Sequence, residues 1–337
     1  MAVPAGLDPK LANVVSQWPH DRPLNACRFN PAGTLVFCGS EDALVERYNI
    51  ADGVRTNFAG GHDTWVQAIG FSKDGKQVIS GACDGKLTWW DTAAGKDAKP
   101  IRSVEAHKGW IRSVDVSPDG TLIASGGNDN LVKLWNVADG KLVRELPGHA
   151  RHVYSVAFHP EGKFLLSGDL VGVLNQWDVA TGKIARTFDA KPLHTYEGGQ
   201  QVDYGGIRAL AVSPDKKWLA AGGLYKGSNP LGAVNEPLVL LFNWETQKIE
   251  KQQIAEGIPG GAIARLSWLA DGSLMGVCGG TTGGFLLFWK PDAEKAFHKF
   301  GLPANVRDMD LHSDGLRVAT AHTDKHLRIT RLAAKPA

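Results

Sequence analysis

The sequence contains little sulfur and no long apolar segment, and each of these shortages excludes a class of protein. Four of its 337 residues are cysteines and three are methionines. The cysteines are far apart, without a CxxC pair or a histidine at metal-ligand spacing, which predicts reduced thiols and no disulfide framework or zinc site. No apolar stretch approaches the roughly 20 residues that a membrane helix needs. The first ten residues lack the basic and apolar runs of a secretory signal, so we expect a cytoplasmic protein without a membrane partner.

Excess charge of one sign is also missing. The chain has 37 Lys and Arg residues against 35 Asp and Glu residues, a formal net charge of +2. This balance, and the lack of a basic run, give no reason to expect a nucleic acid as the partner. The length exceeds that of a typical single domain, so two domains would be expected unless the chain is built from repeats.

The abundant residues are glycine and tryptophan, which number 40 and 11. Both belong to an internal repeat, whose clearest copy reads VQAIGFSKDGKQVISGACDGKLTWWD. Seven copies can be recognised, beginning near Leu24, Val66, Ile111, Val153, Ile207, Ile263 and Val306. Successive starts are 42 to 45 residues apart, except for intervals of 54 before the fifth copy and 56 before the sixth. The chain is therefore one repeat array with two enlarged units.

Each copy reads as three strands joined by tight turns, followed by a fourth, less regular strand. The first turn is Pro-Asp-Gly or a relative such as Lys73-Asp74-Gly75, in which glycine supplies a positive φ without a Cβ penalty. Four antiparallel strands cannot hide both faces of their own sheet. Neighbouring units must therefore stack around a common axis.

Two copies carry the four residues by which the chain resembles the WD-repeat β-propeller family. In that family His, Ser or Thr, Asp and Trp form a hydrogen-bonded tetrad across each blade, and burial requires such polar groups to satisfy one another. The second and third copies match this tetrad in full, with His62, Ser80, Asp84, Trp90, His107, Ser125, Asp129 and Trp135. The resemblance implies an all-β fold, a seven-bladed propeller of four-stranded antiparallel blades.

The other copies match the tetrad only in part. The fourth keeps His149, Ser167 and Trp177 but has Val171 where the aspartate is expected. The first keeps His20 and Asp42, with Cys38 in place of the hydroxyl and Tyr48 in place of Trp. The later copies retain less of the tetrad. The fifth has only Phe242, at the Trp position, and the sixth has only Trp289. The seventh keeps Thr320 and Asp324, and Thr330 replaces its Trp.

The two ends of the chain are expected to meet in the last blade. The seventh copy ends after its third strand, and the segment LANVVSQWPHDR before the first copy resembles a fourth strand. The resemblance implies that this N-terminal strand completes the seventh blade, which would remove exposed sheet edges. The propeller then spans residues 11–332, between an N-terminal tail of residues 1–10 and a C-terminal tail of residues 333–337.

No motif in the chain predicts catalysis. Four of the eleven histidines, His20, His62, His107 and His149, belong to the tetrad pattern. Six that lie outside it are expected to be surface or turn residues, namely His152, His194, His298, His312, His322 and His326. The glycine-rich segment 279–284 lacks the GK[ST] ending and the strand–loop–helix setting of a phosphate-binding loop, so it is interpreted as a hairpin. We therefore expect no enzyme activity, no cofactor and no metal.

Partner binding is expected at one end of the ring, the top rim, which carries the turns before the first strands and those between the second and third strands. In the resembled family, residues flanking the start of each first strand often face the partner. Here they are Trp65, Gln67, Trp110, Arg112, His152, Tyr154, Arg208 and Arg307. Trp, Tyr and Arg contribute most binding energy at protein interfaces. The alternative is that the two indoles pack between neighbouring blades.

Two insertions at the fifth copy, residues 189–206 and 224–237, are expected to project from the same rim. They carry Tyr196, Tyr204 and Tyr225, and long loops in compact domains are often functional; the alternative is neutral decoration. The sequence thus favours a non-catalytic scaffold, monomeric by itself, that binds a protein or peptide of unknown identity through the top rim. The alternative is a small-molecule binder or enzyme that uses the axial channel mouth and these loops.

Overall fold

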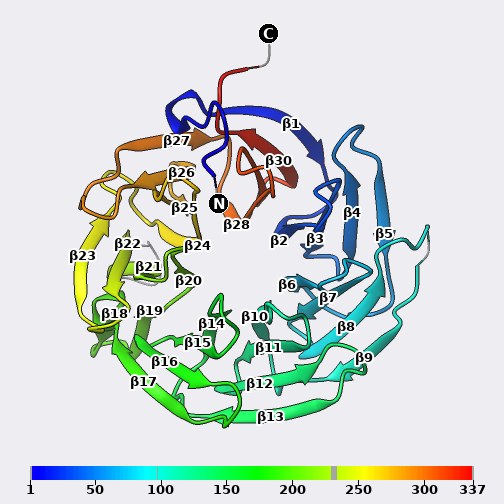
Figure 1. Cartoon of the computed structure of the whole chain (residues 1–337), viewed down its shortest axis with the longest axis horizontal. Helices are drawn as coiled ribbons and strands as arrows, with labels where there is room; N and C mark the ends of the chain where they lie inside the picture. The colour runs from blue at the N-terminus through cyan, green and yellow to red at the C-terminus, as the bar shows by residue number, and fades with distance from the viewer. Residues whose placement is uncertain (1, 97, 229–233, 336–337) are drawn as a thin grey trace.

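Each repeat folds into one four-stranded antiparallel sheet, and the seven sheets stand as blades around a central axis (Figure 1). The computed structural model describes residues 2–96, 98–228 and 234–335. The prediction of an all-β, seven-bladed propeller is confirmed. The two short 3₁₀ helices are η1 (Pro9–Leu11) and η2 (Lys191–Leu193). Among the described residues, no helix has the length and apolar character needed to cross a membrane.

The first four blades use consecutive strands. Blade one contains β2 (Leu24–Phe29), β3 (Leu35–Ser40), β4 (Val45–Asn49) and β5 (Arg55–Phe58). Blade two contains β6 (Val66–Phe71), β7 (Gln77–Ala82), β8 (Lys86–Asp91) and β9 (Arg102–Glu105). Blade three contains β10 (Ile111–Val116), β11 (Leu122–Gly127), β12 (Leu131–Asn136) and β13 (Leu142–Pro147). Blade four contains β14 (Val153–Phe158), β15 (Phe164–Asp169), β16 (Val173–Asp178) and β17 (Ile184–Asp189).

The remaining blades include the enlarged unit and the closure. Blade five contains β20 (Ala209–Val212), β21 (Trp218–Ser228), β22 (Val234–Asn243) and β23 (Ile249–Ile254). Blade six contains β24 (Ala262–Trp268), β25 (Leu274–Gly280), β26 (Gly283–Trp289) and β27 (His298–Leu302). Blade seven contains β28 (Val306–Leu311), β29 (Arg317–His322), β30 (His326–Arg331) and the N-terminal β1 (Asn13–Pro19).

The N-terminal strand closes the ring, as predicted. β1 pairs antiparallel with β30 from Asn13, opposite Arg331, to Pro19, opposite His326. Figure 1 shows the first strand (blue) beside the last (red) at the edge of the seventh blade. Without β1, β30 would present an unpaired edge, which is the usual site of intermolecular strand pairing.

The turn from first to second strand follows from its sequence. In blade three, the carboxylate of Asp119 accepts hydrogen bonds from the hydroxyl of Ser117 (2.6 Å) and the backbone N–H of Thr121 (3.0 Å). Gly120 follows with φ of 78°, a left-handed conformation that glycine adopts without a Cβ penalty. The tight turn therefore reverses the chain, so that β11 pairs antiparallel with β10.

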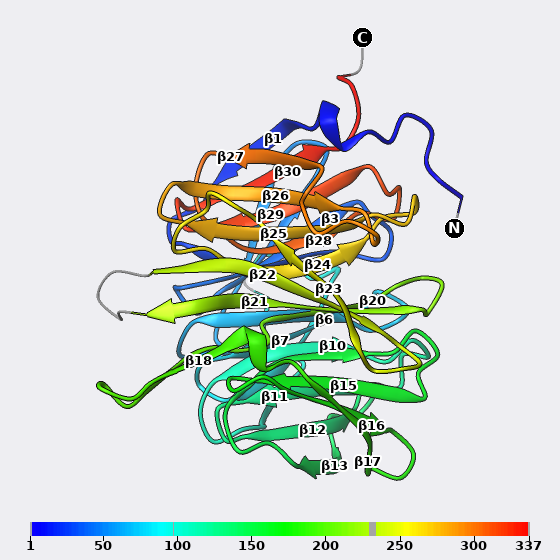
Figure 2. The same cartoon turned by 90° about the vertical axis from the view of Figure 1, so that its left-hand side faces the viewer.

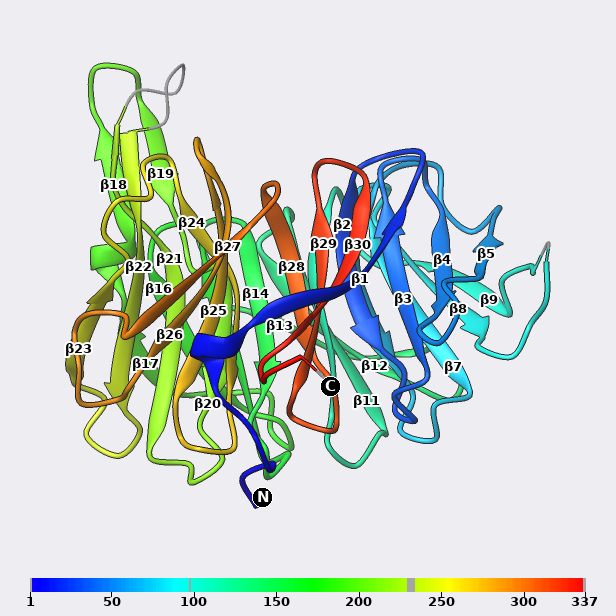
Figure 3. The same ribbon diagram turned by 90° about the horizontal axis from the view of Figure 1, so that it is seen from above.

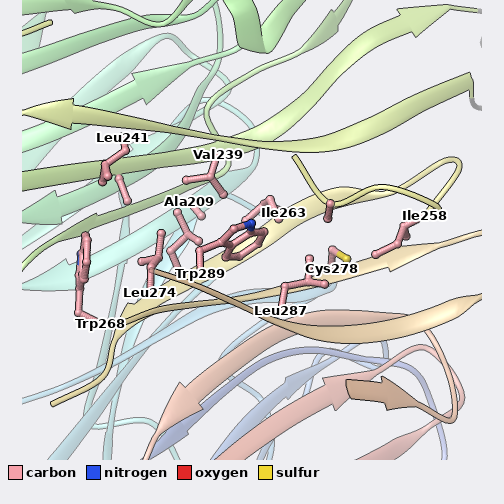
Figure 4. Packing of buried hydrophobic residues seen from close by; sticks show 13 residues of the cluster. Ala209, Val239, Leu241, Ile258, Ile263, Trp268, Leu274, Cys278, Leu287 and Trp289 are labelled. Atoms are coloured by element: carbon pink, nitrogen blue, oxygen red, sulfur yellow. The ribbon is translucent and has the colours of Figure 1, made fainter. Parts of the chain in front are cut away.

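Hydrophobic side chains fill the spaces between neighbouring blades. The cluster between blades five and six joins Val239 and Leu241 of β22 to Ile263 of β24 and to Trp289, which is fully buried (Figure 4). Fully burying a large apolar side chain contributes roughly 1.5–3 kcal/mol. Each blade thus depends on its neighbours for a core, as expected of a repeat fold.

The two insertions project from the same end of the ring beside blade five (Figures 2 and 3). Residues 189–206 form η2 and a hairpin of β18 (His194–Glu197) and β19 (Val202–Gly205), and both strands contact β21. Residues 224–237 largely extend β21 and β22, while residues 229–233 lie outside the described residues. The expected irregular loops are thus mostly paired strands.

Candidate interaction surface at the channel mouth

Two intact tetrads position the turns of the top rim. In blade two, the indole N–H of Trp90 donates to Ser80 Oγ (2.8 Å), and this hydroxyl lies 2.7 Å from Nε2 of His62. Asp84 accepts from Nδ1 of His62 (3.2 Å) and from the backbone N–H of Asp63 (2.9 Å). The tetrad therefore ties the histidine turn to the second and third strands.

The same network in blade three has the partners predicted for it. His107 lies 2.8 Å from Asp129 and 2.7 Å from Ser125, whose hydroxyl also accepts the indole N–H of Trp135 at 2.9 Å. Hydrogen bonds from His107 help lower the pKa of Asp129, although burial acts in the opposite direction. The imidazole and the carboxylate thus hold each other in one orientation.

In blades two and three, the tetrad histidine is followed three residues later by a tryptophan on the surface. Trp65 and Trp110 follow His62 and His107 and remain 42% and 39% exposed. Their ring centroids are 6.5 Å apart, with planes inclined by 44°. The backbone carbonyl of Trp65 accepts the N–H group of Cys83, and that of Trp110 accepts the N–H group of Asn128, each at 2.9 Å. These hydrogen bonds hold both turns. These exposures rule against the alternative that the indoles are buried between blades.

The mouth of the axial channel lies beside this pair and contains a cavity of about 570 Å³. Of the residues predicted for partner binding, five line it, namely Gln67, Arg112, Tyr154, Arg208 and Arg307. The described lining does not include Trp65, Trp110, His152, Tyr196, Tyr204 or Tyr225. The structure thus brings five of the eleven predicted residues together at the mouth, and the other six lie outside this lining.

Two arginines contact the ring of one tyrosine at the mouth. The guanidinium carbons of Arg112 and Arg208 lie 5.0 and 5.1 Å from the ring centroid of Tyr154. Arg112 also lies 4.6 Å from the ring centroid of Trp110, and its Nε donates to Asn128 Oδ1 at 2.9 Å. Cation–π contacts of this kind hold a guanidinium in place without neutralising it.

Deeper in the channel, charged residues neutralise one another. Asp308 accepts a hydrogen bond from Arg28 and lies 3.9 Å from Nε of Arg265. Asp115 and Asp310 accept backbone N–H groups of Phe158 (2.6 Å) and Phe29 (2.8 Å) from neighbouring blades, although burial raises the pKa of both carboxyls. These contacts join first strands of different blades around the axis.

Comparison with known proteins agrees with this geometry. The sequence profile of the family described as "WD domain, G-beta repeat" matches residues 13–47, 54–91, 98–136, 140–178 and 190–226, more than half of the chain. The chain belongs to this WD-repeat family. The profile thus covers the first five units, and the structure extends the propeller through blades six and seven.

Individual relatives of the WD-repeat chain match it over short stretches. Echinoderm microtubule-associated protein-like 3 of Homo sapiens is 30% identical over 76 residues, which is 21% of this chain and 8% of that protein. Eukaryotic translation initiation factor 3 subunit I of Schizosaccharomyces pombe is 32% identical over 77 residues, 23% of this chain and 24% of that protein. Serine-threonine kinase receptor-associated protein of Bos taurus is 32% identical over 73 residues, which is 22% of this chain and 21% of that protein. The matches therefore span a quarter or less of each relative's length.

In blade four, the missing tetrad aspartate is replaced from another position. The hydroxyl of Ser167 accepts the indole N–H of Trp177 and contacts His149, each at 2.7 Å. Nδ1 of His149 donates to Asp169 (3.0 Å), which stands at the end of β15, two residues before Val171. The prediction of an incomplete WD tetrad was wrong for this blade, because a carboxylate at the strand end reaches the same imidazole.

In blade one, the predicted tetrad partners were also partly wrong. Nε2 of His20 contacts Glu46, while its distance to Asp42 is 3.9 Å. Glu46 is paired across the sheet with Cys38 and is fully buried, so its carboxylate occupies the blade interior. Among the residues that the structure describes, His20, Asp42 and Glu46 form a group whose potential metal-ligand atoms lie within 4.8 Å of one another. Their mutual contacts take the place of the tetrad.

Blade seven uses a histidine at the end of its second strand, β29, and not one in the turn before the first strand. Nε2 of His322 lies 2.8 Å from Thr320 Oγ1, and its Nδ1 lies 3.1 Å from the carbonyl oxygen of Ala304. Asp324 instead pairs with Arg328 at 2.6 and 2.8 Å. The expectation that His322 is a surface or turn residue was wrong, since it is fully buried. Burial lowers its pKa to about 4.

His312 was likewise expected at the surface and is buried. Its Nε2 lies 2.9 Å from the carbonyl oxygen of Gly33, and its ring packs edge-on against Phe29 at a centroid distance of 4.8 Å. It therefore joins the bottom turns of blades seven and one. His152, which was predicted to bind the partner, is partly exposed, and burial lowers its pKa.

The three tyrosines of the insertions lie in different surroundings. Tyr196 is 58% exposed on the β18–β19 hairpin. Tyr204 is partly buried, and its hydroxyl donates to Gln200 (3.2 Å). Tyr225 packs against the buried cluster of blade five. The hairpin is anchored by Asp203, which contacts both His194 (2.8 Å) and Arg151 (3.3 Å).

Sequence reasoning missed Arg28, Arg265 and Asp308 in the channel. A signal for them exists in the strand register. In six blades the pairing shifts near the start of the inner strand, between its first and third residues, as between Ile111 and Ser113, or, in β24, between Ile263 and Arg265. This bulge breaks the simple alternation of faces and adds a second channel-facing position further along each strand.

Proposed function

We propose that this WD-repeat protein is a non-catalytic scaffold that binds a protein or peptide across its top rim and channel mouth. The exposed Trp65–Trp110 pair beside an arginine-lined cavity is the observation that carries the proposal. Large exposed indoles cost hydrophobic free energy unless a partner covers them. Trp, Tyr and Arg are also the residues that dominate binding energy at interfaces.

The preorganisation of these side chains supports a binding role. The tetrads hold the turns of Trp65 and Trp110, and the Tyr154 ring holds Arg112 and Arg208. Side chains that are already ordered lose less conformational entropy when a partner binds. The remaining predicted contacts, Gln67, His152, Arg307 and the loop tyrosine Tyr196, would form the rim of this interface.

The names of the relatives support the same class of function. One is a microtubule-associated protein, one a subunit of a translation initiation factor and one a receptor-associated protein. Each name describes a protein that works in association with others. We infer a comparable assembly role for this chain and leave the particular partner to experiment.

The charged groups of the channel favour binding over catalysis. Asp308 is paired with Arg28, while Asp115 and Asp310 accept backbone N–H groups. These carboxylates are therefore occupied in holding blades together, whereas a general acid or base must reach a substrate proton. The four cysteines are free thiols, which supports a reducing compartment such as the cytoplasm.

The proposal can be tested by affinity purification from the cell of origin. The double variant Trp65→Ala, Trp110→Ala should lose the proteins that the unaltered chain retains, in a quantitative mass-spectrometric comparison. A matched control is Leu142→Ala, Val143→Ala, which removes two side chains of similar exposure (45% and 49%) from the outer strand β13. Equal recovery of the partners by both double variants would overturn the proposed interface.

A further inference from the structure

The charges that line the channel mouth do not balance. The lining contains five arginines and a single aspartate, Asp308. Arg28 is paired with this aspartate, and Arg307 pairs with Glu41 just outside the lining. Arg265 shares Asp308 at the longer distance of 3.9 Å. Arg112 and Arg208 are left, and neither forms an ion pair with any residue that the structure describes.

These two arginines are held by aromatic rings and an amide. Both guanidinium groups contact the Tyr154 ring, and Asn128 accepts from Nε of Arg112. The remaining N–H donors of Arg112 have no protein acceptor among the residues that the structure describes. Burial, together with the neighbouring charge of Arg208, lowers the pKa of Arg112. An anion between the two groups would relieve this repulsion and fill the unused donors.

We propose that Arg112 and Arg208 together receive a carboxylate from an acidic segment of the protein partner. The carboxylate enters the channel mouth beside Tyr154, and the adjoining part of the segment lies on the indoles of Trp65 and Trp110. Two guanidinium groups around one carboxylate allow paired, charge-assisted hydrogen bonds. This inference rests on the proposed function and specifies the chemistry of the partner.

The surroundings favour one inserted acidic group over a nucleic-acid backbone. Asp63 stands on the same rim, two residues before Trp65; it pairs with Lys86 (2.6 Å), and its side chain is 75% exposed. Asp84 and Asp129 lie beneath the neighbouring turns. A phosphate backbone laid across the rim would approach these carboxylates, whereas a peptide can direct one carboxylate into the mouth.

The test uses short peptides that differ only in charge. An acetylated and amidated (Glu-Gly)₃ peptide is titrated into the full-length protein at low salt, and binding is measured by calorimetry and tryptophan fluorescence. The (Gln-Gly)₃ and (Lys-Gly)₃ peptides are titrated in the same way for comparison. The glutamate peptide should bind, with a change in the emission of the rim indoles. Binding of the glutamine peptide with equal affinity would overturn the proposal, and so would tighter binding of a ten-residue oligothymidylate.

Variants then locate the site. Arg112→Gln and Arg208→Gln should each weaken binding of the glutamate peptide by roughly five-fold or more, as expected for loss of a charge-assisted hydrogen bond. Arg102→Gln on the outer strand β9 removes the same charge far along the blade and should leave binding unchanged. If a glutamine variant unfolds, Arg112→Lys and Arg208→Lys keep the charge and should retain most of the affinity. Unchanged binding by the glutamine variants would overturn the proposal.

The outcome separates the two proposals. If partner recovery depends on Trp65 and Trp110 but is unaffected by Arg112→Gln and Arg208→Gln, the scaffold role stands and the acidic-segment proposal fails. If partner recovery is independent of the tryptophans, the proposed interface itself fails.

Discussion

The carboxylate of Asp169 lies 3.0 Å from Nδ1 of His149, and both side chains are fully buried. Asp169 also accepts the backbone N–H groups of Val171 and Val173, at 3.0 and 2.9 Å. One residue thus orients the tetrad histidine of blade four and forms the following turn. Its replacement should therefore disturb more of the blade than one hydrogen bond.

We predict that Asp169→Ala lowers the free energy of unfolding by about 2–4 kcal/mol, because it leaves a buried imidazole and two backbone donors without their acceptor. Urea unfolding followed by circular dichroism measures this change. The control Val171→Ala alters the position at which the other tetrads carry aspartate and should cost less than about 1 kcal/mol. A larger loss for Val171→Ala than for Asp169→Ala would contradict the assignment.

The closing strand gives a second prediction. Deleting residues 1–20 removes β1 and exposes the edge of β30, so the melting temperature should fall by roughly 10 °C or more and the truncated chain should tend to associate. Deleting residues 1–6 alone retains the strand and should have little effect. Differential scanning calorimetry and light scattering make the comparison. A truncated protein that melts like the intact one would disprove closure by β1.

The buried His322 makes the stability depend on pH. Its folded pKa of about 4 lies below the ordinary value of 6.5, so the unfolded chain binds a proton between these values while the folded chain does not. Stability is therefore present above pH 6.5 and is lost as the pH falls toward 4, by about 2 kcal/mol between pH 7.5 and pH 5. Urea unfolding at both pH values should show this loss.

A matched variant isolates the histidine. His322→Asn retains a donor for the carbonyl of Ala304 but cannot titrate, so its stability should fall by about 2 kcal/mol less than that of the unaltered chain between the same pH values. An identical pH dependence in the two proteins would show that His322 is not responsible.

The cysteines should differ in reactivity. Burial raises the pKa of Cys278 to about 12 and also raises the pKa values of Cys27 and Cys38, so their thiolates are scarce as well as inaccessible. Cys83 is partly exposed. Ellman's reagent should modify Cys83 in the native protein and the other three at least roughly ten-fold more slowly. Cys83→Ser should abolish the native reaction, and rapid modification of this variant would contradict the burial.

The repeat pattern was sufficient to predict the architecture, because each blade repeats one set of turns and one apolar alternation. It also predicted Trp65 and Trp110 at the surface, from their position just before the first apolar residue of each inner strand, and both are exposed. What spacing could not predict were contacts that depend on three-dimensional reach. Asp169 and Glu46 each supply a carboxylate to a tetrad histidine from a position outside the pattern.

The channel shows the same division between pattern and geometry. Arg112 and Arg208 were predicted from their position beside the first apolar residue of the inner strand. Arg265 and Asp308 stand after the bulge, where the register shift changes the face on which they lie. Their pairing joins blades six and seven, and no local pattern within one repeat can specify a contact between two repeats.

The pairing of β1 with β30 also sets the order in which the molecule can be completed. Among the strands of the propeller, β1 is synthesised before all the others and waits for β30, with about three hundred residues made between them. Until then, β1 is an unpaired strand beside a growing arc of blades. Completion of the ring should thus be late and slow, because it depends on contacts distant in sequence. Chaperones that shield unpaired strand edges during synthesis should therefore raise the yield of folded protein.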